Sequence, residues 1–537
     1  MSPLQLGFGV PGGSEISAHL ARITLSNNIP DNVVLKLDFK NAFNTIKRQY
    51  FVPLFCHKYP QYSYILNSYS SPTFLKCNNN IIKSLEGIQQ ADPLGPAFFC
   101  IGIHKIILDI QSISNLTLNS WYLDDGIVSG NFSTVMSIPS IIENLSYITG
   151  LSLNFPKCEI CFLNPTTSIP SETTFLAINR EEMTHLGSPI GGEKAIDTFL
   201  NKSLDNLSNL NSLFNYLPAH QPFFLIKNYF NIPKILYALR SSPIFKCSHL
   251  LVSHETQIKD LLENILNLKF SNSSWLQATL PCKSGGIGIR SPLQLSLSAF
   301  ISSSLAAQSI IDNGYTPSDT DFSQALTSWD NNCSPTRPAS STQKDWDAPL
   351  IARYVEYFIS NRPFEENPNN LVLNANSGYE WLEAIPSANL GLLMTGEQLR
   401  ISIALRLGCN VVVPSICIDC GQPIESKAYH LLPCKFSRGR QPRHKSINNI
   451  LLATLKKVNI PSTLEPVGLS NEYALRPDGI SLIPWSNGLP LTWDYTCVDF
   501  AAKSNLSFSA IEKAEILKKI NTLASPTLCS FLSLSIP

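Results

Sequence analysis

The chain has 537 residues, of which 40 are Lys or Arg and 40 are Asp or Glu, so its formal net charge is zero. Charged residues make up 15% and hydrophobic residues 44% of the sequence. This composition indicates a globular protein and excludes a basic nucleic-acid-coating protein, an acidic disordered tail and a highly charged coiled coil. At about 150 residues per domain, the length predicts roughly three or four domains. The neutral balance argues against a nucleic-acid enzyme, because phosphate binding draws on Lys and Arg.

The N-terminus and the cysteines indicate the compartment. The first residues carry neither the basic n-region nor the apolar h-region of a secretory signal. Because no apolar stretch approaches ~20 residues, we expect an intracellular protein without a membrane partner. The 14 cysteines are scattered along the chain, which predicts reduced, mostly buried thiols rather than a disulfide framework.

The predicted elements of the N-terminal part alternate between strands and helices. In chain order they are a strand at 33–39, a helical pattern from Ala42, a helix at 97–113, a hairpin at 121–128 with Asp124-Asp125-Gly126 as its turn, a helix at 133–150 ending at Gly150, and two strands at 151–163 with Pro156 at a turn.

The rest of the chain is predicted to be mostly helical, with a different pattern near its end. The expected elements are helices over 195–270, a loop or linker over 312–347, a helix at 396–408, a Cys/His cluster after 417, a helix at 444–458, strands at 479–484 and 491–500, and a last helix at 508–524.

Acidic residues stand where the N-terminal strands end. Asp38 closes the apolar run 33–39, and Asp124 and Asp125 lie at the predicted hairpin turn. Two Mg²⁺ ions held by carboxylates on neighbouring strands are the machinery of nucleotidyl transfer. Asp-Asp-Gly is also an ordinary turn sequence, so the surrounding segments decide between the two interpretations.

Five ordered segments together resemble the reverse transcriptase family. They are residues 37–43 as the first acidic motif, 90–96 as the motif that contacts template and nucleotide, 122–125 as the aromatic-x-Asp-Asp box, 153–159 as the motif that follows it, and 185–190 as the primer-grip segment. Residues 5–22 also resemble the segment that precedes the first acidic motif.

This resemblance implies a role for individual residues. Asp38 and Asp124 would be the main Mg²⁺ (or Mn²⁺) ligands, with Asp125 supporting them. Lys157 would lie near the triphosphate and could donate a proton to the leaving pyrophosphate, or it is simply a solvated lysine at a strand end. The residues that would contact nucleotide or template are Phe43 (under the incoming sugar, or as a core aromatic), Gln90, Ala91 and Tyr122.

Two departures from the family pattern bear on activity. Ala91 stands where the family usually has glycine, whose missing side chain permits close approach of the backbone; the methyl group could crowd the nucleotide. The basic finger motifs that should precede residues 5–22 are absent from the sequence. The resemblance therefore implies fingers truncated at the N-terminus, and the neutral charge agrees with that loss.

Four potential metal ligands follow in the C-terminal part. Cys417, Cys420, His430 and Cys434 have the spacing of a zinc knuckle, and Zn²⁺ favours four such ligands in a tetrahedron. Buried thiols are the alternative. Cys158 and Cys161 have no second pair nearby and are expected in the core.

A second set of acids comes after this cluster. Asp478 and Asp494 lie on neighbouring predicted strands, and Lys518 or Lys519 lies on the last helix; acids that hold Mg²⁺ and a lysine that positions water suit a metal-dependent phosphodiesterase. A plain turn at Pro477-Asp478 is the alternative. In this context the segment resembles the restriction-like endonuclease of non-LTR retrotransposons, with Glu465 as a further acid. Thr496 departs from that pattern, which often has lysine there.

These features together predict an α+β protein with a right-hand polymerase palm and thumb. The expected domains are truncated fingers and palm (1–192), thumb and connecting helices (193–300), a linker or connector (301–395), a zinc-knuckle region (396–440) and an α/β restriction-like endonuclease domain (441–537).

Three functions compete. The first is an RNA-directed DNA polymerase of a non-LTR retrotransposon that nicks its target and uses RNA template, DNA primer, target DNA and dNTPs, with a nuclear site of action. The second is an inactive or co-opted relic that only binds nucleic acid. The third, an intron maturase, needs a basic thumb and a different nuclease motif, and the sequence has neither.

Overall fold

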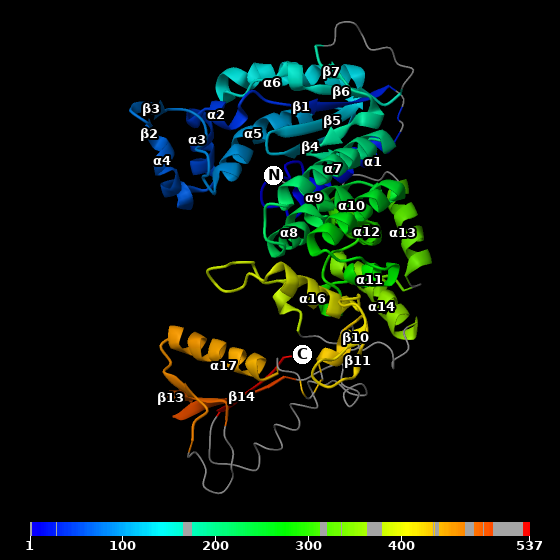
Figure 1. Cartoon of the computed structure of the whole chain (residues 1–537). Coiled ribbons are helices and arrows are strands. Elements are labelled where there is room, and N and C mark those ends of the chain that lie inside the picture. The colour runs from blue at the N-terminus through cyan, green and yellow to red at the C-terminus, as the bar shows by residue number, and fades with distance from the viewer. Residues whose placement is uncertain are drawn as a thin grey trace. The chain divides into compact units, whose positions relative to one another are not determined.

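The computed structural model (Figure 1) divides into two compact units. Unit 1 comprises Met1–Asn209, Ile232–Gln257 and Ser291–Leu350, and unit 2 comprises Leu210–Asn231, Ile258–Arg290 and Ile351–Pro537. The residues that the structure describes are 3–27, 29, 31–164, 174–311, 319–333, 336–361, 378–432, 434, 436, 440–467, 477–486, 488–497 and 530–536.

A five-stranded sheet forms the centre of unit 1. Its strand order is β4-β5-β1-β6-β7, and β1 pairs antiparallel with both β5 and β6. The apolar, β-branched sequence of β1 favours a strand, so the prediction for residues 33–39 is confirmed. The strands are β1 (Asn32–Leu37), β4 (Leu116–Tyr122), β5 (Asp125–Asn131), β6 (Glu159–Phe162) and β7 (Leu176–Ala177).

Helices cover both faces of this sheet (Figure 1). Val33 and Leu35 belong to the apolar cluster shared with α5 (Gly95–Gln111) and α6 (Phe132–Thr149). Val34 points to the other face and packs with α1 (Gly13–Ser26), as the period-2 alternation of a strand requires. The predicted helices at 97–113 and 133–150 are confirmed, and α6 ends at Gly150, whose φ of 78° is left-handed.

A small subdomain lies between β1 and α5 in the sequence. The buried Arg48 guanidinium donates to the carbonyls of Ser84 (2.8 Å) and Gly87 (2.9 Å), which fixes the base of a two-stranded hairpin. The elements are α2 (Ala42–Thr45), α3 (Arg48–Lys58), η1 (Pro60–Leu66), α4 (Asn67–Ser70), β2 (Thr73–Cys77) and β3 (Asn80–Ser84).

The helical stretch predicted over 195–270 is confirmed. Ile235, Leu251 and Leu295 are buried in one cluster that joins helices of unit 1. The elements from the primer-grip segment onward are η2 (Phe155–Lys157), η3 (Arg180–Glu182), β8 (Thr184–His185), β9 (Ser188–Pro189), α7 (Glu193–Phe214), α8 (His220–Leu225), the π-helical η4 (Ile226–Phe230), α9 (Ile232–Ser241), η5 (Ile244–Lys246), α10 (Ser248–Leu266), α11 (Asn272–Ala278), η6 (Cys282–Ser284) and α12 (Pro292–Ile311).

The loop predicted over 312–347 is wrong for much of its length. Residues 320–332 form α13 (Thr320–Asn332), and α14 (Gln343–Asn361) begins before the predicted linker ends. Trp329 and Trp346 are buried, and their ring centroids lie 4.9 Å apart. The polar composition of the segment outweighed its helical spacing, since Phe322, Ala325, Leu326 and Trp329 of α13 recur at i, i+3, i+4 and i+7 and pack in one apolar cluster.

An ion network fixes α13 to α1. The buried Arg22 donates to Asp319 (2.5 Å) and Asp321 (2.7 Å), and Lys246 also pairs with Asp321 (2.5 Å). Removal of one partner would leave a buried charge without compensation, which is strongly destabilising.

Unit 2 contains a short Cys/His segment and a four-stranded sheet of order β12-β13-β14-β15, in which β14 and β15 are parallel. The predicted helices at 396–408 and 444–458 and both predicted strands are confirmed. The predicted last helix at 508–524, with Lys518, lies outside the described residues. The elements are η7 (Glu380–Leu382), α16 (Gly396–Leu407), β10 (Ser415–Ile416), β11 (Pro423–Ile424), η8 (Tyr429–Leu431), α17 (Arg440–Lys457), β12 (Ser462–Leu464), β13 (Gly479–Ser486), β14 (Leu489–Cys497) and β15 (Ser530–Ile536).

Within the described residues, no helix has both the length and the apolar character needed to cross a bilayer.

Candidate active site and metal centre

Backbone pairing places the three acids of the N-terminal motifs at the same end of strands β1 and β5 in the sheet of unit 1. Leu37, the last residue of β1, pairs with Gly126, so Asp38 follows directly beside the start of β5. Tyr122 pairs with Asp125 across the hairpin of β4 and β5. The connecting loop therefore consists of Leu123 and Asp124 alone.

This loop corrects the predicted turn at Asp124-Asp125-Gly126. Asp125 and Gly126 already belong to β5. Gly126 is needed for a different reason: a Cβ there would lie 2.5 Å from the Trp121 ring, which crosses the strand at this point. The turn strain falls instead on Leu123, whose φ is 56°. A non-glycine residue in this conformation costs about 1–3 kcal/mol and persists only when its surroundings hold it.

The carboxylates influence one another. The pKa of Asp125 is raised to about 6 by lost hydration and by the negative charges of Asp124 and Asp38, while Lys36 opposes the rise. The pKa of Asp124 is also raised, mainly by lost hydration, with a contribution from Asp38. Asp125 still exposes part of its side chain. Crowded carboxylates are a favourable setting for a divalent cation, which relieves their repulsion.

A neighbouring segment brings Lys157 to the same end of the sheet of unit 1. The backbone N–H of Asn154 donates to the Asp38 carbonyl (2.8 Å), and the N–H of Lys40 donates to the Ser152 carbonyl (3.0 Å). Lys157 is exposed at the end of the following 3₁₀ turn, η2. Cys158 and Cys161 are buried, as predicted for core cysteines.

The predicted nucleotide contacts lie on several elements of unit 1. Phe43 is half-buried and stacks on Phe99 of α5 at a centroid distance of 4.4 Å, so it belongs to the core and still presents surface. Gln90 is exposed, and Tyr122 is half-buried beside the α1 cluster. Ala91 has a φ of 64°, so its backbone adopts the conformation for which glycine is preferred.

Sequence reasoning assigned no role to several residues that hold these motifs in place. Gln5 is fully buried and bonds both the N–H (2.9 Å) and the carbonyl (3.1 Å) of Leu123. Tyr69 donates to Asp92 (2.6 Å), and Asp92 also accepts from the N–H of Leu94 (2.9 Å) just before α5. Gln5 lies in a segment that resembled the family, but only the fold brings it to a residue 118 positions away.

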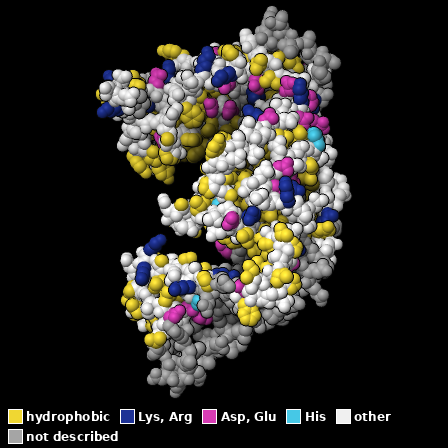
Figure 2. All heavy atoms as spheres, viewed as in Figure 1, with side chains coloured by type: hydrophobic (Ala, Val, Ile, Leu, Met, Phe, Trp, Pro, Cys, Tyr) yellow, Lys and Arg dark blue, Asp and Glu magenta, His cyan; other side chains and the backbone are white. Residues whose placement is uncertain are grey.

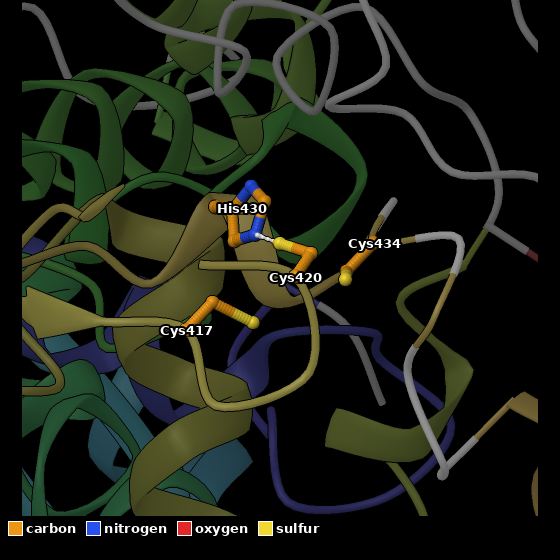
Figure 3. A group of neighbouring side chains, drawn as sticks. All are labelled: Cys417, Cys420, His430 and Cys434. Atoms are coloured by element: carbon orange, nitrogen blue, oxygen red, sulfur yellow. Dashed lines mark hydrogen bonds between the residues drawn. The ribbon is translucent and has the colours of Figure 1, made fainter. Parts of the chain in front are cut away.

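The predicted knuckle residues do come together. The ligand atoms of Cys417, Cys420, His430 and Cys434 all lie within 4.8 Å of one another, and no other such group of three or more His, Cys, Asp or Glu occurs in the described part of the chain. Figure 3 shows the four side chains around one point. Gly421 has a φ of 74° in the turn after the first pair. The donor set and this convergence fit Zn²⁺.

The thiols of this group are not equivalent. The pKa of Cys417 is lowered to about 7, chiefly by the backbone N–H of Cys420 and with help from His430. At Cys420 a hydrogen bond from the Gln422 backbone lowers the pKa, but lost hydration and the thiols of Cys417 and Cys434 outweigh it and raise the pKa. A thiolate is the form that binds metal, so Cys417 is prepared as a ligand.

The second acidic pair consists of Asp478, which directly precedes β13, and Asp494 on β14. Gly479 pairs with Trp493, so the next position along the register sets Asp478 opposite Asp494. The Asp478 Oδ2 atom accepts from the N–H of Tyr495 (2.5 Å) and lies 3.2 Å from Nε2 of His444 on α17.

A chain of hydrogen bonds determines which nitrogen of His444 carries the proton. The Trp493 indole N–H, which can only donate, bonds Oδ1 of Asn448 at 3.2 Å. The amide nitrogen of Asn448 therefore faces Nδ1 of His444, at 3.3 Å. Nδ1 is then the acceptor, and Nε2 carries the proton that faces Asp478.

Positive charge is concentrated near this pair. Residues 426–464 contain eight Lys or Arg and no Asp or Glu, although the whole chain is neutral. Arg443, Lys445, Lys456 and Lys457 are exposed on α17, and Figure 2 shows Lys and Arg side chains gathered over this helix. Such a face suits phosphate groups.

Comparisons with known proteins identify the class of the N-terminal part. Residues 4–190 match the family model for reverse transcriptase (RNA-dependent DNA polymerase). Residues 4–190 are therefore a reverse transcriptase domain, the catalytic domain of RNA-directed DNA polymerases. A search of curated proteins finds no match to the chain.

Two telomerase structures are weakly similar overall. The telomerase of Candida albicans, in complex with a fragment of telomeric RNA, is 10% identical over 50% of this chain and 56% of that chain, with a TM-score of 0.31. The apo telomerase of Candida tropicalis is 11% identical over 58% of this chain and 56% of that chain, with a TM-score of 0.26. This chain thus spans little more than half the length of each telomerase chain.

Proposed function

We propose that the chain is an RNA-directed DNA polymerase of a non-LTR retrotransposon that copies RNA into DNA by metal-dependent nucleotidyl transfer. The observation that carries the proposal is the meeting of Asp38 with the Asp124–Asp125 hairpin inside the domain that matches the reverse transcriptase model. RNA template, DNA primer and dNTPs are the partners of this reaction.

Each residue of the site has a defined task in this reaction. Asp38 and Asp124 would hold Mg²⁺, with Asp125 adding negative charge. When bound, Mg²⁺ lowers the pKa of the primer hydroxyl and neutralises charge on the phosphates. Phe43, supported by Phe99, forms the floor under the incoming sugar. Lys157 is exposed and could protonate the leaving pyrophosphate.

Primer extension on an RNA template tests the polymerase. We expect Asp124→Ala to abolish extension, because it removes a metal ligand without disturbing the apolar core. Asp109→Ala is the matched control, since Asp109 forms an i,i+4 pair with Lys105 on the exposed side of α5. Equal extension by the wild-type chain and Asp124→Ala would refute the polymerase assignment.

The C-terminal unit would supply the nick that primes synthesis. Asp478 and Asp494 would hold Mg²⁺ for DNA cleavage, and Cys417, Cys420, His430 and Cys434 would hold a structural Zn²⁺. The exposed Lys and Arg side chains of α17, the helix whose His444 faces Asp478, support contact with the DNA backbone. Cleavage of target DNA would take place in the nucleus. Lys518 is proposed as the lysine of this site on sequence alone.

Plasmid nicking tests the endonuclease. With Mg²⁺ present, the wild-type chain should convert supercoiled DNA to open circles, and Asp478→Ala should not. Asp330→Ala is the control, because Asp330 forms an ion pair with the exposed Arg337 in unit 1 and has no role in this proposal. Nicking that persists in Asp478→Ala would remove this site from the proposal.

A relic that only binds nucleic acid is the second candidate function. The left-handed Ala91 favours it, because a methyl group occupies a position where the family usually has glycine. A chain that retains nucleic-acid binding through α17 but shows neither extension nor nicking would be such a relic. Binding measured by electrophoretic mobility shift at two salt concentrations separates these outcomes.

A further inference from the structure

We infer that Gln5 is a positioning residue for the catalytic hairpin, acting through the backbone of Leu123. This inference rests on the proposed polymerase function and deepens it. Gln5 touches none of the three acids; it holds the residue that precedes Asp124.

The carboxamide of Gln5 bonds both polar groups of one strained residue. Its Oε1 atom accepts from the N–H of Leu123 (2.9 Å), and its Nε2 atom donates to the carbonyl of Leu123 (3.1 Å). Oε1 also accepts from the N–H of Gly7 (2.9 Å), which fixes the orientation of the amide. Two donors meet the oxygen and one acceptor meets the nitrogen, so only one orientation satisfies all three bonds.

The backbone around Gln5 is fixed to the same strand. Leu6 donates to the Trp121 carbonyl, and Trp121 donates to the Leu4 carbonyl, both at 2.8 Å. Gly7 completes the fit, because a Cβ there would lie 2.5 Å from the backbone nitrogen of Leu123. Residues 4–7 therefore form a clamp on the hairpin between β4 and β5.

The clamp stabilises a backbone conformation that Leu123 would not adopt without it. A left-handed leucine is disfavoured because its Cβ crowds the following carbonyl oxygen, and the orientation of Asp124 depends on this conformation of the two-residue loop. Without Gln5, Leu123 can relax toward negative φ, and the acids at the hairpin tip move with it. Misplacement of a catalytic group by about 1 Å can lower the rate roughly 100-fold.

Gln5→Met tests the clamp, since methionine has a similar length and forms none of the three bonds. Gln277→Met is the matched control, because Gln277 is also fully buried and its Nε2 atom donates to two backbone carbonyls, those of Gly285 and Arg406 (both 3.1 Å). We expect kcat for primer extension to fall roughly 10- to 100-fold in Gln5→Met, with a smaller change in KM for dNTP. Gln277→Met should keep kcat within about threefold of wild type.

Two measurements do not depend on polymerase activity. Hydrogen exchange should accelerate in peptides spanning 119–126 of Gln5→Met but not of Gln277→Met. Mn²⁺ binding, followed by electron paramagnetic resonance, should weaken only in Gln5→Met.

The double variant Gln5→Met/Leu123→Gly should recover part of the lost rate of primer extension, because glycine adopts positive φ without strain.

The failure of the inference differs from the failure of the proposed function. If the wild-type chain extends primers and Gln5→Met matches Gln277→Met in kcat, exchange and Mn²⁺ binding, the clamp is refuted and the polymerase stands. If the wild-type chain extends no better than Asp124→Ala, the polymerase is refuted, and exchange and Mn²⁺ binding alone decide the clamp.

Discussion

Both units set acidic residues on or next to adjoining antiparallel strands, but the surroundings of the two sets differ. The pKa values of Asp124 and Asp125 are raised by lost hydration and by neighbouring carboxylates. Asp478 instead accepts from a backbone N–H and faces the protonated nitrogen of His444. Repelling carboxylates destabilise a fold until a cation joins them, whereas a hydrogen-bonded carboxylate is already compensated. Of the two acidic sites, the hairpin of unit 1 is therefore the one that a bound cation would stabilise more.

For unit 2, we expect the largest effect from loss of the metal that the Cys/His cluster would hold. Cys417→Ser should abolish zinc binding and unfold residues 409–434, because structural zinc provides about 10–16 kcal/mol of folding free energy. Metal analysis should find about one zinc per wild-type chain and none in the variant. Hydrogen exchange should accelerate around residues 409–434 and stay unchanged in the palm.

Cys56→Ser is the control for this experiment, since Cys56 is a half-buried free thiol of unit 1. It should retain zinc and the exchange pattern of the wild-type chain. A wild-type chain without zinc, or a Cys417→Ser variant with normal exchange, would contradict a structural zinc centre and leave a cluster of metal-free thiol and imidazole groups as the better description.

Sequence could predict the elements whose signals are local. The apolar run of β1, the helix after Pro93 and Pro96, and the Gly150 helix end are each encoded within a few residues. The Cys/His spacing likewise predicted a cluster that the fold assembles. These signals depend on chain neighbours, so no long-range contact is needed to read them.

Features that depend on distant contacts could not be predicted. Gly126 was assigned to a turn, but the Trp121 ring across the strand explains it. The role of Gln5 depends on a partner 118 residues away. The ion pairs of Asp319 and Asp321 with Arg22 join α13 to a helix about 300 residues earlier, and its apolar side packs in a cluster with residues of other helices. The hydrogen bonds of His444 and Asn448 could not be predicted, because they depend on the packing of α17 beside β14.

A substitution in the clamp of unit 1 should have the next largest effect on stability and activity. Gly7→Ala should lower the free energy of unfolding by roughly 1–3 kcal/mol, because the new methyl group would lie 2.5 Å from the Leu123 nitrogen. It should also reduce primer extension by moving the hairpin. Gly9→Ala is the control: its Cβ meets nothing within 4 Å, and only the cost of its positive φ remains. Denaturant unfolding of both variants measures the difference, and equal losses would show that the close contact does not restrain the hairpin.

The charge crowding at the hairpin predicts a pH dependence. The pKa of Asp125 is raised from 3.8 to about 6 in the folded chain, so folding binds a proton between these values. Its contribution to stability is therefore greatest at low pH and is lost as the pH rises through about 6. Asp125→Asn should make stability without divalent cations fall less between pH 4.5 and pH 7.5, by a modest amount because the side chain is partly exposed.

Unfolding at both pH values, with and without Mg²⁺, measures this effect. Mg²⁺ should restore wild-type stability at pH 7.5, because it binds only the folded chain. Wild-type and Asp125→Asn chains that lose stability in parallel with pH would show that the carboxylates do not repel one another as the geometry implies.

Two alanines in left-handed backbone give the smallest and most discriminating comparison. Ala91 in unit 1 has a φ of 64°, and Ala428 beside the Cys/His cluster has a φ of 59°. Replacing either with glycine relieves similar backbone strain but makes the unfolded chain more flexible, so each change should shift stability by at most about 1 kcal/mol. Only Ala91 belongs to the motif that would approach the nucleotide. Ala91→Gly should therefore lower KM for dNTP in primer extension, whereas Ala428→Gly should leave it unchanged. An unchanged KM in Ala91→Gly would mean that the methyl group does not crowd the nucleotide, and the main structural support for an inactive relic would disappear.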